Sequence, residues 1–167
     1  MKKWLIGIGV LALLAITLEV RLALSRDPPG PMQQPVAFSH KIHAGDYKIA
    51  CEYCHIYARR AAVAGIPSVQ RCMGCHKITA RANPEVRKLR DYWNRKESIQ
   101  WQKVTQMPDY VYFEHWPHIR SAIACQTCHG AVETMGQVRQ ARDLTMSYCV
   151  SCHREKQVSI DCATCHR

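Results

Sequence analysis

The sequence predicts a mostly irregular domain with short α-helices, carried on a single N-terminal transmembrane helix. Three observations lead to this fold class: an apolar N-terminal run, ten cysteines in one recurring spacing, and only two phenylalanines for a core. With about 140 residues outside the membrane, the chain offers little material for an ordinary hydrophobic interior. We therefore expect something other than side chains inside the domain, short helices around the cysteines, and minimal strand content.

Residues 1–25 are expected to form the membrane anchor. Two lysines precede an apolar run from Trp4 to Leu18, which continues to residue 24 around Glu19 and Arg21. A helix over residues 4–24 would be about 31 Å long, enough to cross a bilayer. A cleaved signal peptide is the alternative, but the sequence shows no convincing small-x-small cleavage site. The leading lysines predict a cytoplasmic N-terminus, with the remaining chain on the outer, periplasmic side of the cytoplasmic membrane.

A proline-rich linker is predicted over residues 26–35. The sequence Asp27-Pro-Pro-Gly-Pro ends the anchor helix, because proline lacks the amide hydrogen that a helix needs and clashes with the preceding turn. The soluble domain is then expected over residues 36–167.

Every cysteine falls in a C-x-x-C-H unit, and none is left over. This spacing suits covalent haem attachment, because two thiols add to the two vinyl groups of one haem and the next histidine becomes the proximal iron ligand. Zinc knuckles, redox dithiols and disulfides would make no use of a histidine after every second cysteine. The sequence predicts five covalent haem c groups, held by Cys51, Cys54, His55; Cys72, Cys75, His76; Cys125, Cys128, His129; Cys149, Cys152, His153; and Cys162, Cys165, His166.

Two similar strings precede the first and third of these motifs. Val36-Ala-Phe-Ser-His40-Lys-Ile-His43 and Val111-Tyr-Phe-Glu-His115-Trp-Pro-His118 share the pattern V-x-F-x-H-x-x-H, and each leads into Ile-Ala-Cys-x-x-Cys-His. This indicates an internal duplication of residues 36–90 and 111–167, with the motif at Cys162 as an extra unit. All four histidines outside the motifs lie in these strings, so we expect them to be distal haem ligands: His40, His43, His115 and His118.

The distal ligand of the fifth haem needs a separate explanation, because five irons would share four spare histidines. Methionine is the usual substitute, and its thioether raises the reduction potential relative to a second histidine. Met135 and Met146 lie among the last three motifs and are the predicted choices. A five-coordinate or water-bound iron is the alternative, and it would open the way to catalysis.

The formal charge of +10 by itself would suggest a nucleic-acid or anionic membrane partner. The basic residues are scattered, however, and five haems would add ten propionates, roughly −10 when ionised. The basic excess is then mostly internal compensation, and no nucleic-acid partner is expected.

One longer helix is predicted between the two halves. It begins after Asn83, a favourable N-cap residue, with proline at its first position and a glutamate where the helix dipole favours an acid. Val86, Leu89 and Trp93 fall on one face of this helix, which we expect to cover haem edges.

The strings around the motifs resemble the multihaem cytochromes of the cytochrome c3/c7 type. F-S-H-K-I-H stands ahead of C-E-Y-C-H, and G-I-P-S-V-Q-R-C-M-G-C-H follows. With P-E-V-R-K-L, M-P-D-Y-V-Y-F-E-H, C-H-G-A-V and L-T-M-S-Y-C-V-S-C-H-R, and one N-terminal helix, the chain is similar to the pentahaem c-type cytochrome subunit of alternative complex III. The resemblance covers about residues 36–167 and implies a c3/c7-like haem domain.

This resemblance implies an electron-transfer subunit of a bacterial quinol-oxidising complex, without substrate chemistry of its own. The implied partners are an iron–sulfur subunit, polytopic membrane subunits, a monohaem cytochrome, and a soluble acceptor such as a cytochrome c or a copper protein. Electrons would pass from quinol through iron–sulfur centres to the haems. The family pattern also carries the four spare histidines over as axial ligands.

Two other functions remain open from the sequence. A stand-alone, membrane-anchored quinol dehydrogenase feeding a periplasmic reductase would use the anchor and the first haem as its quinol site. The linker and the distance to Cys51 make contact between that haem and the membrane less direct. A haem enzyme, such as a nitrite or hydroxylamine converter, would need an open iron position surrounded by acid–base residues.

Overall fold

The computed structural model describes residues 12–19, 21 and 32–166. The chain divides into two units, Met1–Gly30 and Pro31–Arg167. In the first unit, residues 12–19 and 21 are helical. Among the residues that the structure describes, no helix combines the length and the apolar character needed to cross a membrane. Most of the anchor expected over residues 1–25, and most of the linker expected over residues 26–35, lies outside the described residues.

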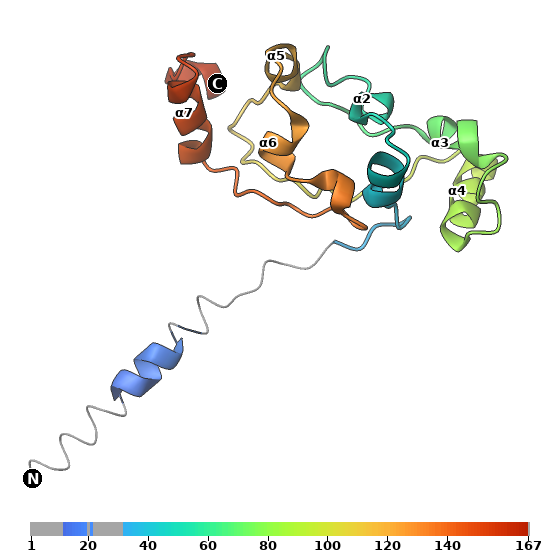
Figure 1. Ribbon diagram of the computed structural model, residues 1–167, viewed down its shortest axis with the longest axis horizontal. Coiled ribbons are helices and arrows are strands. Elements are labelled where there is room, and N and C mark those ends of the chain that lie inside the picture. The colour runs from blue at the N-terminus through green and yellow to red at the C-terminus, as the bar shows by residue number, and fades with distance from the viewer. Residues whose placement is uncertain (1–11, 20, 22–31, 167) are drawn as a thin grey trace, which may run out of the picture. The chain divides into compact units, whose positions relative to one another are not determined.

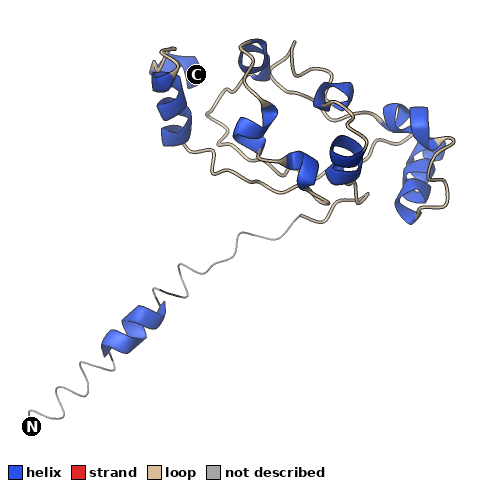
Figure 2. Ribbon diagram, viewed as in Figure 1, coloured by secondary structure: helices blue, strands red, loops and turns tan. Residues whose placement is uncertain are grey.

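The second unit is built from short helices joined by long irregular segments (Figures 1 and 2). Over residues 32–166 no strand is formed, so the predicted class of short helices and irregular chain is confirmed there. The helices are η1 (Lys41–Asp46), α2 (Cys51–Cys54), α3 (Val69–His76), α4 (Pro84–Arg95), α5 (His115–Arg120), α6 (Cys125–His129), η2 (Val132–Thr134), α7 (Met146–Glu155) and α8 (Cys162–Cys165).

Each C-x-x-C-H motif lies on about one turn of helix. Helices α2, α6 and α8 begin at the first cysteine of a motif, and the motifs of α3 and α7 occupy the C-terminal part of a longer helix. Residues three and four positions apart share one face of a helix, so one turn brings both thiols and the histidine to the same side. The motif therefore needs little surrounding secondary structure.

Helix α4 begins where the sequence predicts and has the predicted apolar face. The Asn83 side chain accepts a hydrogen bond from the Glu85 amide at 2.8 Å, and proline occupies the first helical position. The helix ends at Arg95, and the next residue, Lys96, has a left-handed φ of 56°. Val86 and Leu89 are buried, as the predicted apolar face requires.

The main hydrophobic cluster lies where α3 packs on α4, at one end of the unit. Its buried members are Val36, Val69, Met73, Leu89 and Ile99, with Cys72, Tyr92, Trp93 and Trp101 packed against them. In the part of the chain that the structure describes, no side chain is less than 2% exposed. Side chains alone thus leave the rest of this unit without a close-packed interior.

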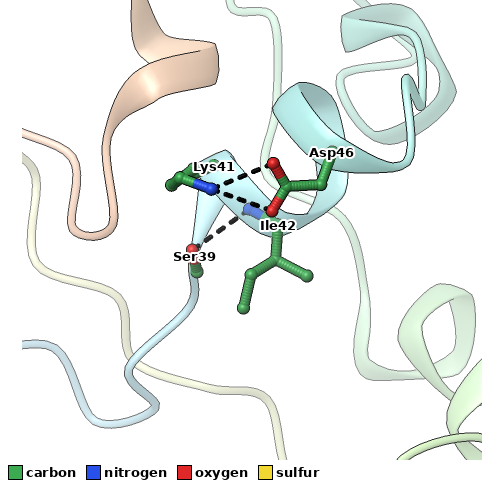
Figure 3. Close-up of polar contacts among 4 residues, drawn as sticks. All are labelled: Ser39, Lys41, Ile42 and Asp46. Carbon is green, nitrogen blue, oxygen red and sulfur yellow. Dashed lines mark hydrogen bonds and ion pairs between the residues drawn. The ribbon is translucent and has the colours of Figure 1, made fainter.

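The π-helical turn η1 places His40 and His43 at its start and in its middle. The Ser39 hydroxyl oxygen accepts a hydrogen bond from the Ile42 amide at 3.2 Å, as Figure 3 shows. The Lys41 ammonium donates to both carboxylate oxygens of Asp46, at 2.9 and 3.0 Å. The Lys41 amide also donates to the Met135 carbonyl at 2.8 Å, which joins η1 to the segment around η2.

Truncating Leu89 tests the cluster between α3 and α4. This side chain is 5% exposed, so Leu89→Ala should lower the free energy of unfolding of the haem-loaded protein by about 2–3 kcal/mol, since a cavity replaces packed methyl groups. Denaturant titration followed by circular dichroism measures the change. Asn94→Ala on the exposed face of the same helix is the control and should change stability by less than about 0.5 kcal/mol. Equal effects of the two substitutions would show that α4 does not pack as described.

Candidate haem sites

A backbone carbonyl holds the ring of most motif histidines through Nδ1. A carbonyl oxygen only accepts, so Nδ1 must carry the hydrogen, and Nε2 keeps its lone pair for a metal. Metal-binding histidines commonly have such a partner, which fixes the tautomer and the ring orientation. The Nδ1 to oxygen distances are 2.6 Å for His55 and Gly65, 3.2 Å for His76 and Thr79, 2.7 Å for His153 and Ser159, and 3.1 Å for His166 and Tyr110.

Three of the four spare histidines are oriented in the same way. The Nδ1 atom of His43 lies 2.8 Å from the Ser39 carbonyl, and that of His118 lies 2.8 Å from the Glu114 carbonyl. The Nδ1 atom of His115 lies 2.7 Å from the carbonyl of Ala62, which belongs to the other half of the chain. These histidines too present Nε2 as a free electron-pair donor.

His40 is the exception among the spare histidines. Its Nδ1 is buried and has no hydrogen-bond partner among the described residues. Burial, with smaller contributions from the nearby His55 and His43, lowers the pKa of His40 to about 4. Burial also lowers the pKa of His129, with His115 and His55 contributing. Both rings are therefore neutral near pH 7, which is the form that binds a metal.

The spare and motif histidines meet in pairs at a separation that fits one iron. The ring centres lie 6.0 Å apart in His43 and His76, 6.2 Å apart in His115 and His129, and 6.0 Å apart in His118 and His153. A metal–imidazole bond is about 2.0 Å long, so two imidazoles on opposite sides of one ion have centres about 6 Å apart. His40 and His55 are the remaining neighbours, as the pKa of His40 shows. The donors present therefore fit bis-histidine haem.

Each of the two phenylalanines packs against two spare histidines, a role that the sequence reasoning missed. Phe38 stacks on His43 with ring centres 4.4 Å apart and meets His40 edge-on at 4.9 Å. Phe113 repeats the arrangement with its own pair of histidines, at 4.6 and 4.9 Å. The signal was present in the repeated string, where phenylalanine stands two residues before the first histidine in both copies.

The fifth motif has different surroundings. The His166 ring lies 5.8 Å from the Tyr110 ring, and no second imidazole contacts it among the described residues. The Tyr112 amide donates to the Cys165 carbonyl at 2.8 Å, so the connecting segment supports this motif. Met135 is 6% exposed and packs near Gly130, whereas Met146, the first residue of α7, is 68% exposed. The fifth distal ligand therefore stays a prediction.

The motifs follow one another in space in an order that differs from their order in the sequence. None of the ten cysteines is in a disulfide, and burial raises the pKa of several of their thiols, with a thiol of the neighbouring motif raising it in the same direction. Figure 1 shows α3 at one end of the unit, α2 and α6 between, and α7 near the C-terminus. The neighbouring thiols, from one end to the other, are Cys72 with Cys54, Cys51 with Cys125, Cys128 with Cys149, and Cys149 with Cys165.

Comparison with known proteins gives two family matches and one relative. Residues 20–100 match the class III cytochrome C family, and residues 111–167 match the family of cytochrome c7 and related cytochrome c. The multiheme cytochrome c subunit of a menaquinone reductase from Nitratidesulfovibrio vulgaris is 34% identical over 98 residues. The match covers 58% of this chain and 46% of that protein, so the chain spans less than half of its relative. Both halves of the chain are thus similar to multihaem cytochromes of the c3/c7 type, which supports covalent haem c and electron transfer.

Proposed function

We propose that this chain is a five-haem electron-transfer subunit of a membrane-bound, quinol-linked oxidoreductase complex. The observation that carries the proposal is the set of histidine pairs at 6.0–6.2 Å, each joining a spare histidine to a histidine of a C-x-x-C-H motif. Haem c, when bound, supplies one-electron chemistry between ferric and ferrous iron. The family matches in both halves agree with this function.

The side chains have a positioning role in this proposal. The motif thiols fix each haem covalently, and the backbone carbonyls fix the imidazole tautomers so that each ring offers Nε2 to an iron. Phe38 and Phe113 restrict the rotation of the distal rings that they contact. A spare and a motif histidine would hold each of four haems from both sides and leave no position for substrate there, so this part of the chain would conduct electrons without catalysing a reaction.

The order of the motifs gives the order of electron transfer in this proposal. Electrons would pass along the second, first, third, fourth and fifth motifs, or in the reverse direction. The thiol neighbours support each of these four steps. The inner step, between the first and third motifs, joins the two halves and is supported by the closeness of Cys51 and Cys125.

The surroundings of the chain complete the proposal. Residues 1–25 would anchor it in the cytoplasmic membrane, with the haem domain on the periplasmic side. An iron–sulfur subunit, polytopic membrane subunits, a monohaem cytochrome and a soluble acceptor would be its partners, as in alternative complex III. A stand-alone, membrane-anchored quinol dehydrogenase is the alternative, and it would purify from detergent with quinol oxidation but without other subunits.

Counting the haems tests the proposal first. The intact protein, expressed with the cytochrome c maturation machinery, should carry five covalent haems by mass spectrometry, and dithionite should reduce all of them. The double variant Cys162→Ala/Cys165→Ala should carry four. A wild-type protein with fewer than five haems, or with disulfides in place of haem, would contradict the proposal.

A change of distal ligand tests the histidine pairs. His43→Met replaces a nitrogen ligand by a thioether, so the potential of one haem should rise by roughly 0.1 V, a fraction of the range of about 0.8 V that axial ligands span. A redox titration monitored by electron paramagnetic resonance measures this shift. His118→Met, the matching change in the second half, should shift a different haem, and Tyr47→Leu, an exposed neighbour, should shift none. Unchanged potentials in both methionine variants would contradict the assignment.

The direction of electron flow separates two candidate functions. Resemblance to alternative complex III favours quinol oxidation, whereas the name of the Nitratidesulfovibrio vulgaris relative favours a complex that reduces menaquinone. The isolated complex should be assayed both ways, with a quinol analogue and oxidised cytochrome c, and with a reduced cytochrome and a menaquinone analogue. Faster turnover in the first assay supports quinol oxidation, and faster turnover in the second supports menaquinone reduction.

A further inference from the structure

A side-chain contact joins the two motifs of each half of the domain. In the first half, the Arg71 guanidinium lies over the Tyr53 ring, 5.2 Å from its centre. In the second half, the Tyr148 hydroxyl donates a hydrogen bond to the Thr127 carbonyl at 2.6 Å. Neither contact involves a cysteine or a histidine, so haem attachment by itself does not require them. We call these two contacts the intermotif bridges.

The two bridges occupy equivalent positions in the two halves. Tyr53 and Thr127 are each the second residue between the two cysteines of the leading motif. Arg71 and Tyr148 each stand directly before the first cysteine of the trailing motif. The two motifs begin 21 residues apart in the first half and 24 residues apart in the second. Connecting segments of different length therefore bring the same two positions together, although the side chains at these positions differ.

Each bridging side chain projects from the first turn of a helix, where hydrogen bonds fix the backbone. The Arg71 amide donates at 3.0 Å to the carbonyl of Ser68, the N-cap of α3. The Tyr148 amide donates at 3.3 Å to the hydroxyl of Thr145, the N-cap of α7. Ser68 and Thr145 both stand four residues before the first cysteine of their motif. The start of each bridge is therefore tied to the helix that carries the trailing motif.

A bridge restricts the movement of the trailing motif relative to the leading motif. Both thiols and the histidine of a motif lie on about one turn of helix, so a haem attached there would move with that turn. A contact between two motifs then fixes the separation and the relative orientation of the two haems. Electron transfer between haems depends steeply on both quantities, because the electron tunnels from one macrocycle to the next.

The step from the fourth to the fifth motif has no such bridge among the described residues. The Ser151 hydroxyl, in the position equivalent to Thr127, donates to the Tyr148 carbonyl of its own helix at 3.0 Å. Asp161 stands directly before the fifth motif, and its carboxylate accepts a hydrogen bond from the Ser159 hydroxyl at 3.2 Å. The bridge is therefore a feature of the two similar halves and does not follow from the motif spacing alone.

Arg71 differs from Tyr148 in adding a positive charge. It forms no ion pair with another residue that the structure describes. Burial raises the pKa of the Cys54 and Cys72 thiols, and the charge of Arg71 opposes that rise at both. The guanidinium thus lies near one thiol of the first motif and one thiol of the second. A positive charge there favours the ferrous form of both haems, since reduction removes one positive charge from each iron.

We propose that Arg71 and Tyr148 are positioning residues, which hold the two haems of each half at a fixed separation for electron transfer. The inference rests on the proposed electron-transfer function and names the side chains that set the haem geometry. In the first half, the same side chain also raises the reduction potentials of the two haems between which it lies.

Removal of one hydroxyl tests the bridge of the second half. Tyr148→Phe loses only the hydrogen bond to Thr127, and Tyr47→Phe, at a side chain that is 74% exposed, is the matched control. Two haems in a fixed relative orientation give a pair of Soret circular dichroism bands of opposite sign. A hydrogen bond favours the bonded arrangement by roughly fivefold, so the amplitude of this pair should fall by about half in Tyr148→Phe. The control should keep the wild-type amplitude, and equal amplitudes in both variants would overturn the proposal.

Removal of one charge tests the bridge of the first half. Arg71→Met keeps a long side chain, and Arg87→Met on the exposed face of α4 makes the same change of net charge. In a spectroelectrochemical titration, the equilibrium constants for reduction of two haems should fall about tenfold in Arg71→Met, a negative shift of about 59 mV for each. Arg87→Met should change them by less than about twofold, because solvent screens its charge. Arg71→Lys should keep potentials close to those of the wild type.

The number of haems that shift decides the position of Arg71. A shift of two haems in Arg71→Met supports a charge between the first and second motifs. A shift of one haem alone is the result expected of an arginine that only pairs with a propionate, and it would overturn the proposal. Equal shifts in Arg71→Met and Arg87→Met would also overturn it.

Haem content separates a failed bridge from a failed function. All variants should carry five haems by mass spectrometry and should be fully reduced by dithionite. Wild-type Soret bands and potentials in Tyr148→Phe and Arg71→Met, with five reducible haems, would overturn the bridges and leave the electron-transfer function intact. A wild-type protein without five reducible haems would overturn both.

Discussion

The hydrogen bond from imidazole Nδ1 to a backbone carbonyl is the interaction on which the rest of this domain depends. It is present for seven of the nine histidines, at 2.6–3.2 Å. The carbonyls come from irregular segments, which can point an oxygen at a ring where a helix or a strand would use that oxygen in its own hydrogen bonds. The large share of irregular chain is therefore a requirement of the sites. Some of these bonds are also tertiary contacts, as between His115 and Ala62 or His166 and Tyr110.

Hydrophobic packing is distributed unevenly in the domain. Within residues 32–166, a conventional hydrophobic cluster forms only where α3 meets α4, with Leu89 and Met73 as its best buried members. Elsewhere in the described residues the phenylalanines pack on the spare histidines, but no second cluster of buried side chains forms. Haem macrocycles held at these positions would supply the missing apolar contacts. The haems would then both carry electrons and form much of the hydrophobic core.

The sequence predicted the local features well, because each depends on neighbours along the chain. The C-x-x-C-H spacing, the cap at Asn83 and the buried face of α4 all belong to this group. The hydrogen bond between His115 and Ala62 and the closeness of Cys51 and Cys125 join residues that are more than fifty positions apart in the sequence. No spacing rule encodes such distances, so the spatial order of the motifs emerged only from the structure. The anchor was read from composition and lies largely outside the described residues.

The meeting of the first and third motifs has a consequence for how such domains change in evolution. Two halves that share the V-x-F-x-H-x-x-H string and join through their leading motifs turn their trailing motifs outward, away from the junction. New haem units can then be added at either outer end without disturbing the contacts between the halves. The motif at Cys162, which follows the fourth motif closely in sequence and lies beside it through Cys149, has the position of such an addition. A row of haem motifs built in this way can gain a motif, or come to bind a different partner protein at one end, while the contacts between its two halves stay the same.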